Sequence, residues 1–251
     1  MSKIADYRLK LRQTADWEPF LRRESGLPGP RSNLELAQAV ADEASEAWLR
    51  RHAALGPEVA PVNEPPGFLA MCGVIGLGRL LCAGQRDVLD DLWRLAQDPR
   101  WRIREAVAMA LQRWGDTDMD ALLTAMLSWA EGPPLVQRAA AAALAEPRLL
   151  KATHHAAEVL RLLDRITASL STAVDRRSED FRVLRQGMAY CWSVAVAALP
   201  EEGQPLLEKW SQHPDPDVRW LIRENLKKNR LRKLAPEWAD RLLFAAAGKE
   251  G

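Results

Sequence analysis

The sequence predicts an all-helical fold of stacked helix pairs, and three observations support this prediction. Apolar residues recur at three- and four-residue intervals through nearly the whole chain, whereas the alternation typical of strands is scarce. Ala, Leu, Arg and Glu are abundant, while only 2 Tyr and 4 Phe are present. Proline and glycine interrupt the pattern at short intervals, for example at residues 56–57, 132–134 and 214–216, so the pieces between them are one helix or one short helix pair long.

The composition is that of a folded protein without a strong charge. The 251 residues are long enough to bury a sizeable core, and 47% of them are hydrophobic. Lys plus Arg (35) nearly equals Asp plus Glu (34), which gives a net charge of +1. An electrostatic docking surface for nucleic acid or an anionic membrane would therefore need local segregation of charge.

Cellular location is predicted from the start of the chain, its apolar runs and its cysteines. The charged first residues lack the apolar region of a signal peptide. The most apolar stretch, residues 68–82, is interrupted by three glycines and Arg79, which argues against a membrane span. Cys72, Cys82 and Cys191 stand in helical contexts without metal-like or redox spacing. We therefore expect a cytoplasmic protein with no membrane contact.

Internal repetition divides the helices into units. Asp98-Pro99 and Asp215-Pro216 are each expected to begin a helix, with the Asp as N-cap and the Pro in the first helical position. Weaker echoes of these segments begin near residues 136 and 184. Aligning on Ile103, Val136, Leu184 and Ile222 gives spacings of 33, 48 and 38 residues. Such periods are typical of helical arrays, in which each unit buries its apolar face against its neighbours.

Each of these four helices has a candidate partner helix before it in the sequence. The partners are expected near residues 88–95, 122–127, 152–172 and 205–210, where apolar residues follow a helical spacing. The prediction is therefore two helices per unit, joined by short turns.

The repeated segments resemble a known family. D-P-x-W-R from Asp98 to Arg102 and D-P-x-V-R from Asp215 to Arg219 look like the inter-helix signature of HEAT repeats and bacterial lyase-type HEAT-like repeats. The resemblance covers about residues 86–146 and 201–231, and loosely 151–199. It implies an α-α superhelix, that is, a HEAT-like solenoid, in which Asp98, Arg102, Asp215 and Arg219 are structural residues. It also implies a binding scaffold as the function.

The domain organisation follows from this pattern. Residues 1–66 are expected to form an N-terminal helical cap that ends in a proline-rich loop at 57–66, with Ser32 or Asn33 capping one of its helices. Residues 67–251 are expected to form HEAT-like helix pairs in one continuous array. A partner-binding groove between the N-terminal helices is the alternative to a simple cap.

Motifs for catalysis or ligand binding are weak. The glycines at 73–78 lack the strand and spacing of a nucleotide site, and close helix packing explains them better. The acidic residues at 116–120 are not followed by the Gly and Glu of a calcium loop. The adjacent rings of His154 and His155 are expected to diverge by about 100° on a helix and so not to share a metal. We expect no cofactor, no metal and no catalytic site.

Local charge gives the strongest functional prediction. Arginines recur at related places on the four repeat helices, two of them beside tryptophans, and residues 219–233 carry seven cations and one acid. If the helices lie side by side, these residues form a row on the concave surface of the array, which suits an acidic protein or phosphates. The predicted binding residues are Trp101, Arg104, Arg138, Arg185, Arg219, Trp220, Arg223, Lys227, Lys228 and Arg230.

Two functions fit this sequence. The first is a non-catalytic scaffold that holds a protein partner on the concave face of the solenoid. The second is a DNA-binding protein related to the HEAT-like alkylpurine DNA glycosylases, which resemble this chain in length, repeat architecture and basic, tryptophan-rich helices. Their W-W-D-x-x-D element does not occur here, and Asp116, which follows Trp114, is the nearest acid. A lyase acting on bilin chromophores is a third, weaker hypothesis.

Overall fold

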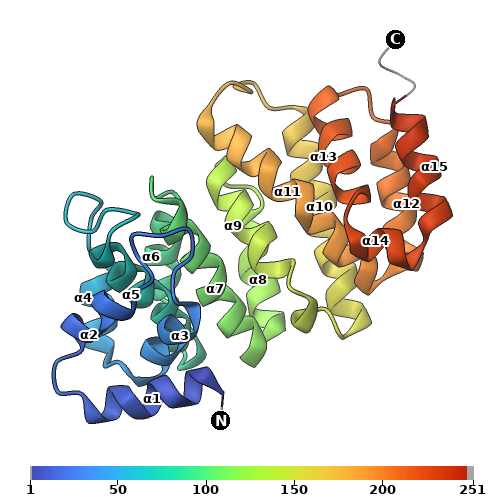
Figure 1. Ribbon diagram of the computed structural model, residues 1–251. Coiled ribbons are helices and arrows are strands. Elements are labelled where there is room, and N and C mark those ends of the chain that lie inside the picture. The colour runs from blue at the N-terminus through green and yellow to red at the C-terminus, as the bar shows by residue number, and fades with distance from the viewer. Residues whose placement is uncertain (1, 248–251) are drawn as a thin grey trace. The chain divides into compact units, whose positions relative to one another are not determined.

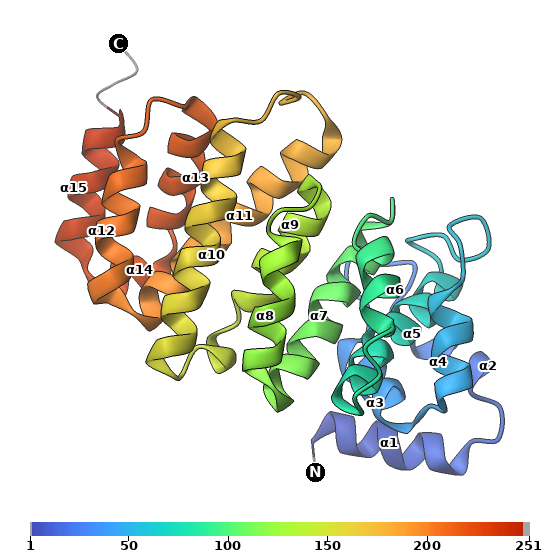
Figure 2. The same cartoon turned by 180° about the vertical axis from the view of Figure 1, so that it is seen from behind.

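The computed structural model describes residues 2–247, and all regular structure in this range is helical. The chain divides between Asp118 and Met119 into two compact units, called unit 1 and unit 2 (Figures 1 and 2). Side chains are described up to Phe244. The prediction of an all-α helical-repeat fold is confirmed.

Over residues 2–118, unit 1 contains seven helices in two layers. They are α1 (Lys3–Gln13), α2 (Trp17–Glu24), α3 (Leu34–Glu43), α4 (Glu46–Ala53), α5 (Pro65–Cys82), α6 (Val88–Leu95) and α7 (Trp101–Thr117). The first layer contains α1, α3, α5 and α7, each packed on the next, and α2, α4 and α6 pack against α5 from the other layer. The expected helix cap at Ser32 or Asn33 is Asn33, whose side chain accepts a hydrogen bond from the backbone N–H of Leu36.

The glycines of α5 allow its neighbours to approach closely. A Cβ atom on Gly73 would lie 2.4 Å from the backbone nitrogen of Ala53 in α4, and one on Gly78 would lie 2.3 Å from the carbonyl oxygen of Ala110 in α7. Backbone atoms cannot yield as a flexible side chain can. The prediction that close packing explains these glycines is confirmed.

The helix α5 is long and apolar enough to cross a membrane when judged by length and composition alone. In unit 1 it lies among α2, α3, α4, α6 and α7, and 78% of the segment is buried. Core helices pass the same test, so the fold accounts for its apolar composition.

Unit 2 repeats the two-layer arrangement. Its helices are α8 (Met119–Trp129), α9 (Pro134–Leu144), α10 (Thr153–Ser171), α11 (Glu179–Ala198), α12 (Pro200–Ser211), α13 (Pro216–Leu226), α14 (Asn229–Leu234) and α15 (Pro236–Ala247), with one 3₁₀ turn (Pro147–Leu149). The helices α9, α11 and α13 pack side by side in one layer, and α8, α10 and α12 pack against them from the other (Figures 1 and 2). Each predicted helix pair of this region is therefore present.

The boundary expected after residue 66 falls near the start of α5, within unit 1. The compact units instead divide between α7 and α8. A single continuous array over residues 67–251 stays a prediction.

The two Asp-Pro segments begin their helices differently. Asp215 caps α13 as predicted, because its side chain accepts hydrogen bonds from the backbone N–H groups of Asp217 and Val218. The prediction that Asp98 caps α7 is wrong. Its carboxylate binds the backbone N–H and the guanidinium of Arg100, and the helix begins only at Trp101.

This difference shifts the repeat register. At the third helical position, α7 and α9 carry Ile103 and Val136, whereas α11 and α13 carry Phe181 and Val218. The sequence alignment chose Leu184 and Ile222, which lie one helical turn later. Residues three or four positions apart share a helix face. Leu184 and Ile222 are therefore buried like Phe181 and Val218, although the alignment placed them at the wrong helical position.

Candidate binding surface

The outward face of α11 provides the centre of the candidate site. The helix buries Leu184, Met188 and Trp192, whereas Arg182, Gln186 and Tyr190 are exposed at four-residue intervals. This spacing places the three exposed side chains in one stripe. The neighbours α9 and α13 flank α11 within its own layer, so their side chains border the stripe on either side.

Arg185 joins α11 to α13. Its guanidinium lies 4.3 Å from the centre of the Trp220 ring and forms an ion pair with Asp217 in the first turn of α13. Arg176, in the loop before α11, binds the same carboxylate at 3.0 Å and also pairs with Asp215. The Arg185 side chain is thus held in place against a half-buried indole.

Tyr190 forms a second aromatic–cation group one turn beyond Gln186. Its ring is 45% exposed and its hydroxyl accepts a hydrogen bond from the guanidinium of Arg230. The same guanidinium lies 4.8 Å from the ring centre, and the ammonium of Lys228 lies 5.9 Å from it. An exposed tyrosine therefore has two cations beside it, one at the N-cap of α14 and one within α14.

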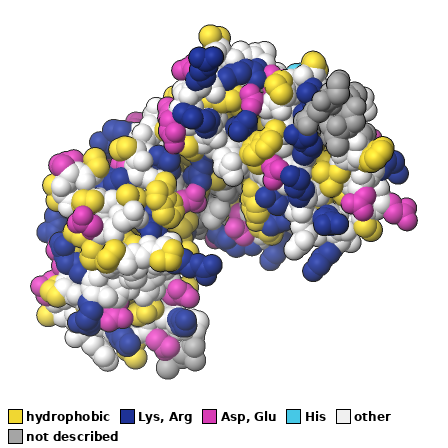
Figure 3. Space-filling model, turned by 45° about the horizontal axis from the view of Figure 1, so that its top comes forward, with side chains coloured by type: hydrophobic (Ala, Val, Ile, Leu, Met, Phe, Trp, Pro, Cys, Tyr) yellow, Lys and Arg dark blue, Asp and Glu magenta, His cyan; other side chains and the backbone are white. Residues whose placement is uncertain are grey.

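Further cations come from the flanking helices. On α9, the Arg138 side chain passes close to Gly187 of α11, where an added Cβ would lie 3.0 Å from its Cγ. On α13, Arg223 is half-buried, and Lys227 at the C-terminal end of this helix pairs with Glu224 at 2.5 Å. Within the view of Figure 3, Lys and Arg side chains lie among apolar ones over unit 2.

These groups define what we call the arginine–aromatic surface. A guanidinium lies beside each of its two aromatic rings. Its members lie on the outward side of the α9–α11–α13 layer and at the adjoining α14. They are Arg138, Arg185, Tyr190, Trp220, Arg223, Lys227, Lys228 and Arg230. Seven of the ten predicted binding residues are among them.

The other three predicted residues lie elsewhere or serve another purpose. Arg219, in unit 2, donates to the carbonyl oxygens of His213 and Pro214, so it fastens the turn before α13. Arg104, in unit 1, donates in the same way to the carbonyls of Asp98 and Pro99 before α7. Trp101 is exposed at the start of α7. The helix α7 belongs to unit 1, whereas α9, α11 and α13 belong to unit 2. That the arginines of all four helices form one row therefore stays a prediction.

Sequence reasoning missed Tyr190 and Asp217. Tyr190 lies in the segment Ala189-Tyr190-Cys191-Trp192, in which no residue was predicted to bind a partner. The four-residue spacing from Arg182 and Gln186 was the available signal for exposure. Asp217 was noticed only as part of a helix start, and nothing local shows that two distant arginines bind it.

A hollow of about 580 Å³ surrounds Trp101 in unit 1. Its lining combines apolar side chains with charged ones: Leu34, Met71, Trp101 and Met109 with Arg31, Glu35, Arg102 and Glu105. The Arg102 guanidinium lies 4.2 Å from the Trp101 ring centre, and its nitrogens donate to the carbonyls of Gly29 and Val62 and to the Ser32 hydroxyl. Arg102 is therefore a structural residue, as its motif implied.

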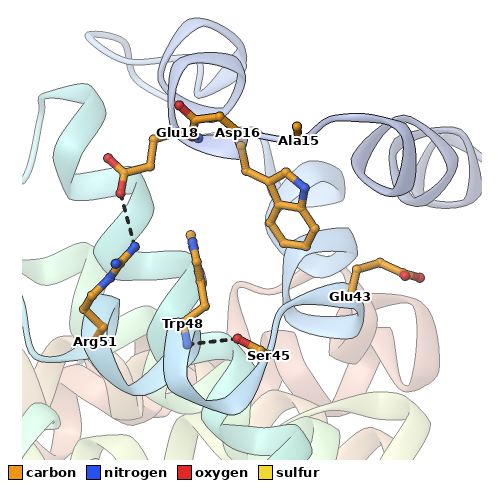
Figure 4. A pocket seen from close by; sticks show the side chains of 8 residues that line it. Ala15, Asp16, Glu18, Glu43, Ser45, Trp48 and Arg51 are labelled. Carbon is orange, nitrogen blue, oxygen red and sulfur yellow. Dashed lines mark hydrogen bonds and ion pairs between the residues drawn. The ribbon is translucent and has the colours of Figure 1, made fainter.

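A smaller hollow, of about 310 Å³, lies between α2 and α4 (Figure 4). Trp17 and Trp48 line it as a tilted pair with ring centres 6.2 Å apart. Glu18 pairs with Arg51 on the same hollow (Figure 4). Glu18 also accepts a hydrogen bond from His52, and although partial burial opposes it, this contact together with Arg22 lowers the pKa of Glu18. The N-terminal helices therefore form a hollow where the alternative prediction expected a groove. Its charged groups Glu18 and Arg51 bind one another.

The tryptophans divide between core and surface. Trp114, Trp129, Trp192 and Trp210 are buried. Trp93 in unit 1 and Trp220 in unit 2 are half-buried.

The paired helices of both units define the chain as a helical-repeat protein. Comparison with protein families agrees, since a model described as HEAT repeats matches residues 71–145, from α5 to the end of α9. The chain is a HEAT-like helical-repeat protein. The search of curated proteins finds no match. Solenoids of this kind use their stacked helices as extended binding surfaces.

Proposed function

We propose that this chain is a non-catalytic scaffold that holds an acidic segment of a protein partner on the arginine–aromatic surface. One observation carries the proposal: the ring of the exposed Tyr190 has the guanidinium of Arg230 4.8 Å and the ammonium of Lys228 5.9 Å from its centre. Tyrosine, tryptophan and arginine are the residues that most often dominate protein–protein binding energy. Cations around such rings complement carboxylates on a partner.

The anchors are held before a partner arrives. Arg185 is fixed by Asp217 and Trp220, and Arg230 by the Tyr190 hydroxyl. Side chains that are already ordered lose less conformational entropy on binding. This preorganisation supports a role in recognition rather than in solubility alone.

Charge favours a short acidic segment over a nucleic-acid backbone. The whole chain has a net charge of +1, and Asp217 and Glu224 lie among the cations of the surface. A long phosphate backbone would come close to these carboxylates, whereas a peptide with a few acids can place each one beside a cation.

Peptide binding tests the proposal directly. Fluorescent peptides rich in Asp and Glu, each with one Leu or Phe anchor, are titrated with untagged protein and followed by anisotropy. We expect Tyr190→Ala and Arg230→Ala each to weaken the tightest peptide by about tenfold or more. Arg161→Ala is the matched control, because Arg161 is exposed on α10 in the other layer. Equal loss in the control, or no loss in the two surface variants, contradicts the proposal.

Nucleic-acid binding is the second candidate, and the same Tyr190 group favours it. An exposed aromatic ring beside cations can stack an unpaired base. Single-stranded and duplex oligonucleotides are therefore titrated in parallel at several salt concentrations. Tighter, steeply salt-dependent binding of an oligonucleotide would replace the peptide proposal.

Glycosylase chemistry finds no further support around Trp114. This side chain is buried, with the Arg86 guanidinium 4.5 Å from its ring centre. Base release from methylated DNA would nevertheless overturn the non-catalytic proposal.

A further inference from the structure

Two helices of unit 2 bring three metal-ligating side chains together. Asp120 lies in the first turn of α8, and His154 and His155 lie in the first turn of α10. One ligand atom from each lies within 4.8 Å of the others. The expectation that the two adjacent rings point well apart is wrong. Their side-chain torsions turn both rings toward Asp120, and the ring centres are 4.0 Å apart.

From this juxtaposition we propose a binding site for a borderline divalent transition-metal ion such as Zn²⁺, formed by Asp120, His154 and His155. The Asp120 Oδ1 atom lies 3.0 Å from Nε2 of His155 and 4.0 Å from Nε2 of His154. Around a tetrahedral Zn²⁺, with ligand bonds of about 2.0–2.2 Å, neighbouring ligand atoms are roughly 3.3 Å apart. Small side-chain rotations therefore suffice to bring the three atoms onto one ion.

A simple hydrogen bond explains only part of this arrangement. A bond between Asp120 and His155 accounts for their contact, but not for the exposed His154 ring that faces the same oxygen. The Asp120 and His154 side chains are 81% and 70% exposed, so burial contributes little to holding them beside one another. A shared ion gives all three groups a reason to converge.

The ligand set selects the class of ion. Two imidazole nitrogens and one carboxylate oxygen suit Zn²⁺ and similar ions, whereas Mg²⁺ and Ca²⁺ prefer oxygen ligands throughout. Three protein ligands leave at least one coordination position for water. Because two of the ligands are well exposed, we expect weaker binding than at a closed four-ligand structural site.

The ion would link two helix pairs. Its ligands come from the starts of α8 and α10, the first members of the α8–α9 and α10–α11 pairs. The helices α9 and α11 carry Arg138 and Tyr190 of the arginine–aromatic surface. Metal binding should therefore raise the stability of unit 2, because an ion bound only by the folded state stabilises that state.

The test uses untagged full-length protein from which metals have been removed with a chelator. Calorimetric titration with Zn²⁺ should show one equivalent bound, and Co²⁺ should give the intense visible absorption of a tetrahedral complex. Asp120→Asn, His154→Ala and His155→Ala should each weaken Zn²⁺ binding by at least about tenfold, since even outer-shell partners of metal ligands contribute 10- to 100-fold. Zn²⁺ should also raise the melting temperature of the wild-type protein but not of the triple variant.

Two controls separate this site from other metal binding. Glu158→Gln removes an exposed carboxylate from the next turn of α10, and His213→Gln removes a histidine from the turn before α13. Both variants should bind Zn²⁺ as the wild type does. Circular dichroism checks that each variant is folded. Failure to bind Zn²⁺, undiminished binding by His154→Ala, or equal loss in a control would overturn the proposal.

Discussion

The central helices of the two units differ in how completely they are covered. The helix α5 has neighbours from both layers of unit 1, and 78% of it is buried. The helix α11 occupies the corresponding place in unit 2, yet one stripe of it, with Arg182, Gln186 and Tyr190, remains exposed. The comparison shows how one architecture gives two results: α5 serves only the core, whereas α11 serves the core and also presents a surface.

The two central helices are also joined to the next helix of their layer in different ways. The helices α5 and α7 approach closely at Gly78, where the Ala110 carbonyl fills the place of a side chain. The helices α11 and α13 are joined by Asn225, whose buried amide binds the Ser193 N–H and the Met188 carbonyl. Shape therefore dominates one junction and hydrogen bonding the other.

The largest effect is expected from glycine substitutions in the two central helices. Gly78→Ala should destabilise the protein by about 3 kcal/mol, because the new Cβ meets backbone of α7 and the helices must separate. Gly187→Ala in α11 should change stability by less than about 1 kcal/mol. There the new Cβ meets only the flexible Arg138 side chain, and alanine favours the helix.

Urea unfolding followed by circular dichroism measures both variants. Similar losses in the two would show that α5 is no more tightly enclosed than α11 and would remove the first difference between the units.

Arginine substitutions come second. Arg102→Ala should destabilise unit 1 by about 2–3 kcal/mol, because three partly buried loop acceptors, among them the Gly29 and Val62 carbonyls, lose their donor. Arg185→Ala should cost about 1 kcal/mol, because Arg176 still binds Asp217 after the change. Urea unfolding gives the losses, and hydrogen exchange shows whether the loop around Gly29 is the part released. An equal cost for Arg185→Ala would mean that this arginine is structural rather than part of a binding surface.

The two Asp-Pro segments show what the sequence could and could not predict about the fold. Helix spacing, Pro–Gly breaks and the Asp-Pro repeats were enough to predict the helix pairs and the family. The same Asp-Pro pair gave a correct cap at Asp215 and a wrong one at Asp98. The two caps differ because of Arg100, whose guanidinium donates hydrogen bonds to the Asp98 carboxylate and to the Ala60 carbonyl. That contact spans 40 residues of sequence, which local rules do not consider.

The candidate site was predictable to a similar extent. Arginines at related places on four successive helices were expected to form one row, because packing the buried face of each helix fixes where its other face points. The structure brings Arg138, Arg185 and Arg223 of α9, α11 and α13 into one layer of unit 2, and their role in binding stays a prediction. Tyr190 was missed because its sequence neighbours are apolar. The convergence of Asp120 with His154 and His155 was missed because the position of Asp120, which lies on another helix, depends on tertiary packing.

The third prediction concerns the α11–α13 junction. Asn225→Leu should destabilise unit 2 by about 2 kcal/mol, because it removes a fully buried amide that binds groups on both helices. Asn229→Ala is the control, since this asparagine is exposed at the start of α14, and its loss should stay below about 0.5 kcal/mol. Thermal and urea unfolding measure both. A neutral or stabilising Asn225→Leu would show that packing, rather than hydrogen bonding, holds this junction as it holds the one between α5 and α7.

The smallest effect is expected at Glu43, and it depends on pH. A hydrogen bond from Arg12, reinforced by Arg8, lowers the pKa of Glu43 from 4.5 to about 2 and ties α1 to α3. Because the folded-state pKa is the lower one, the carboxylate stabilises unit 1 above about pH 4.5, and this contribution fades as the pH falls toward 2.

Glu43→Gln should therefore cost about 1 kcal/mol at pH 7, a modest value because both arginines are partly exposed to solvent. The difference between the variant and the wild type should shrink steadily when urea unfolding is repeated at pH 4.5 and pH 3. A difference that stays constant over this range would mean that the side chain acts through packing rather than charge. The edge of unit 1 would then be held by shape, as its centre is at Gly78, and the contrast with the polar junctions of unit 2 would become sharper.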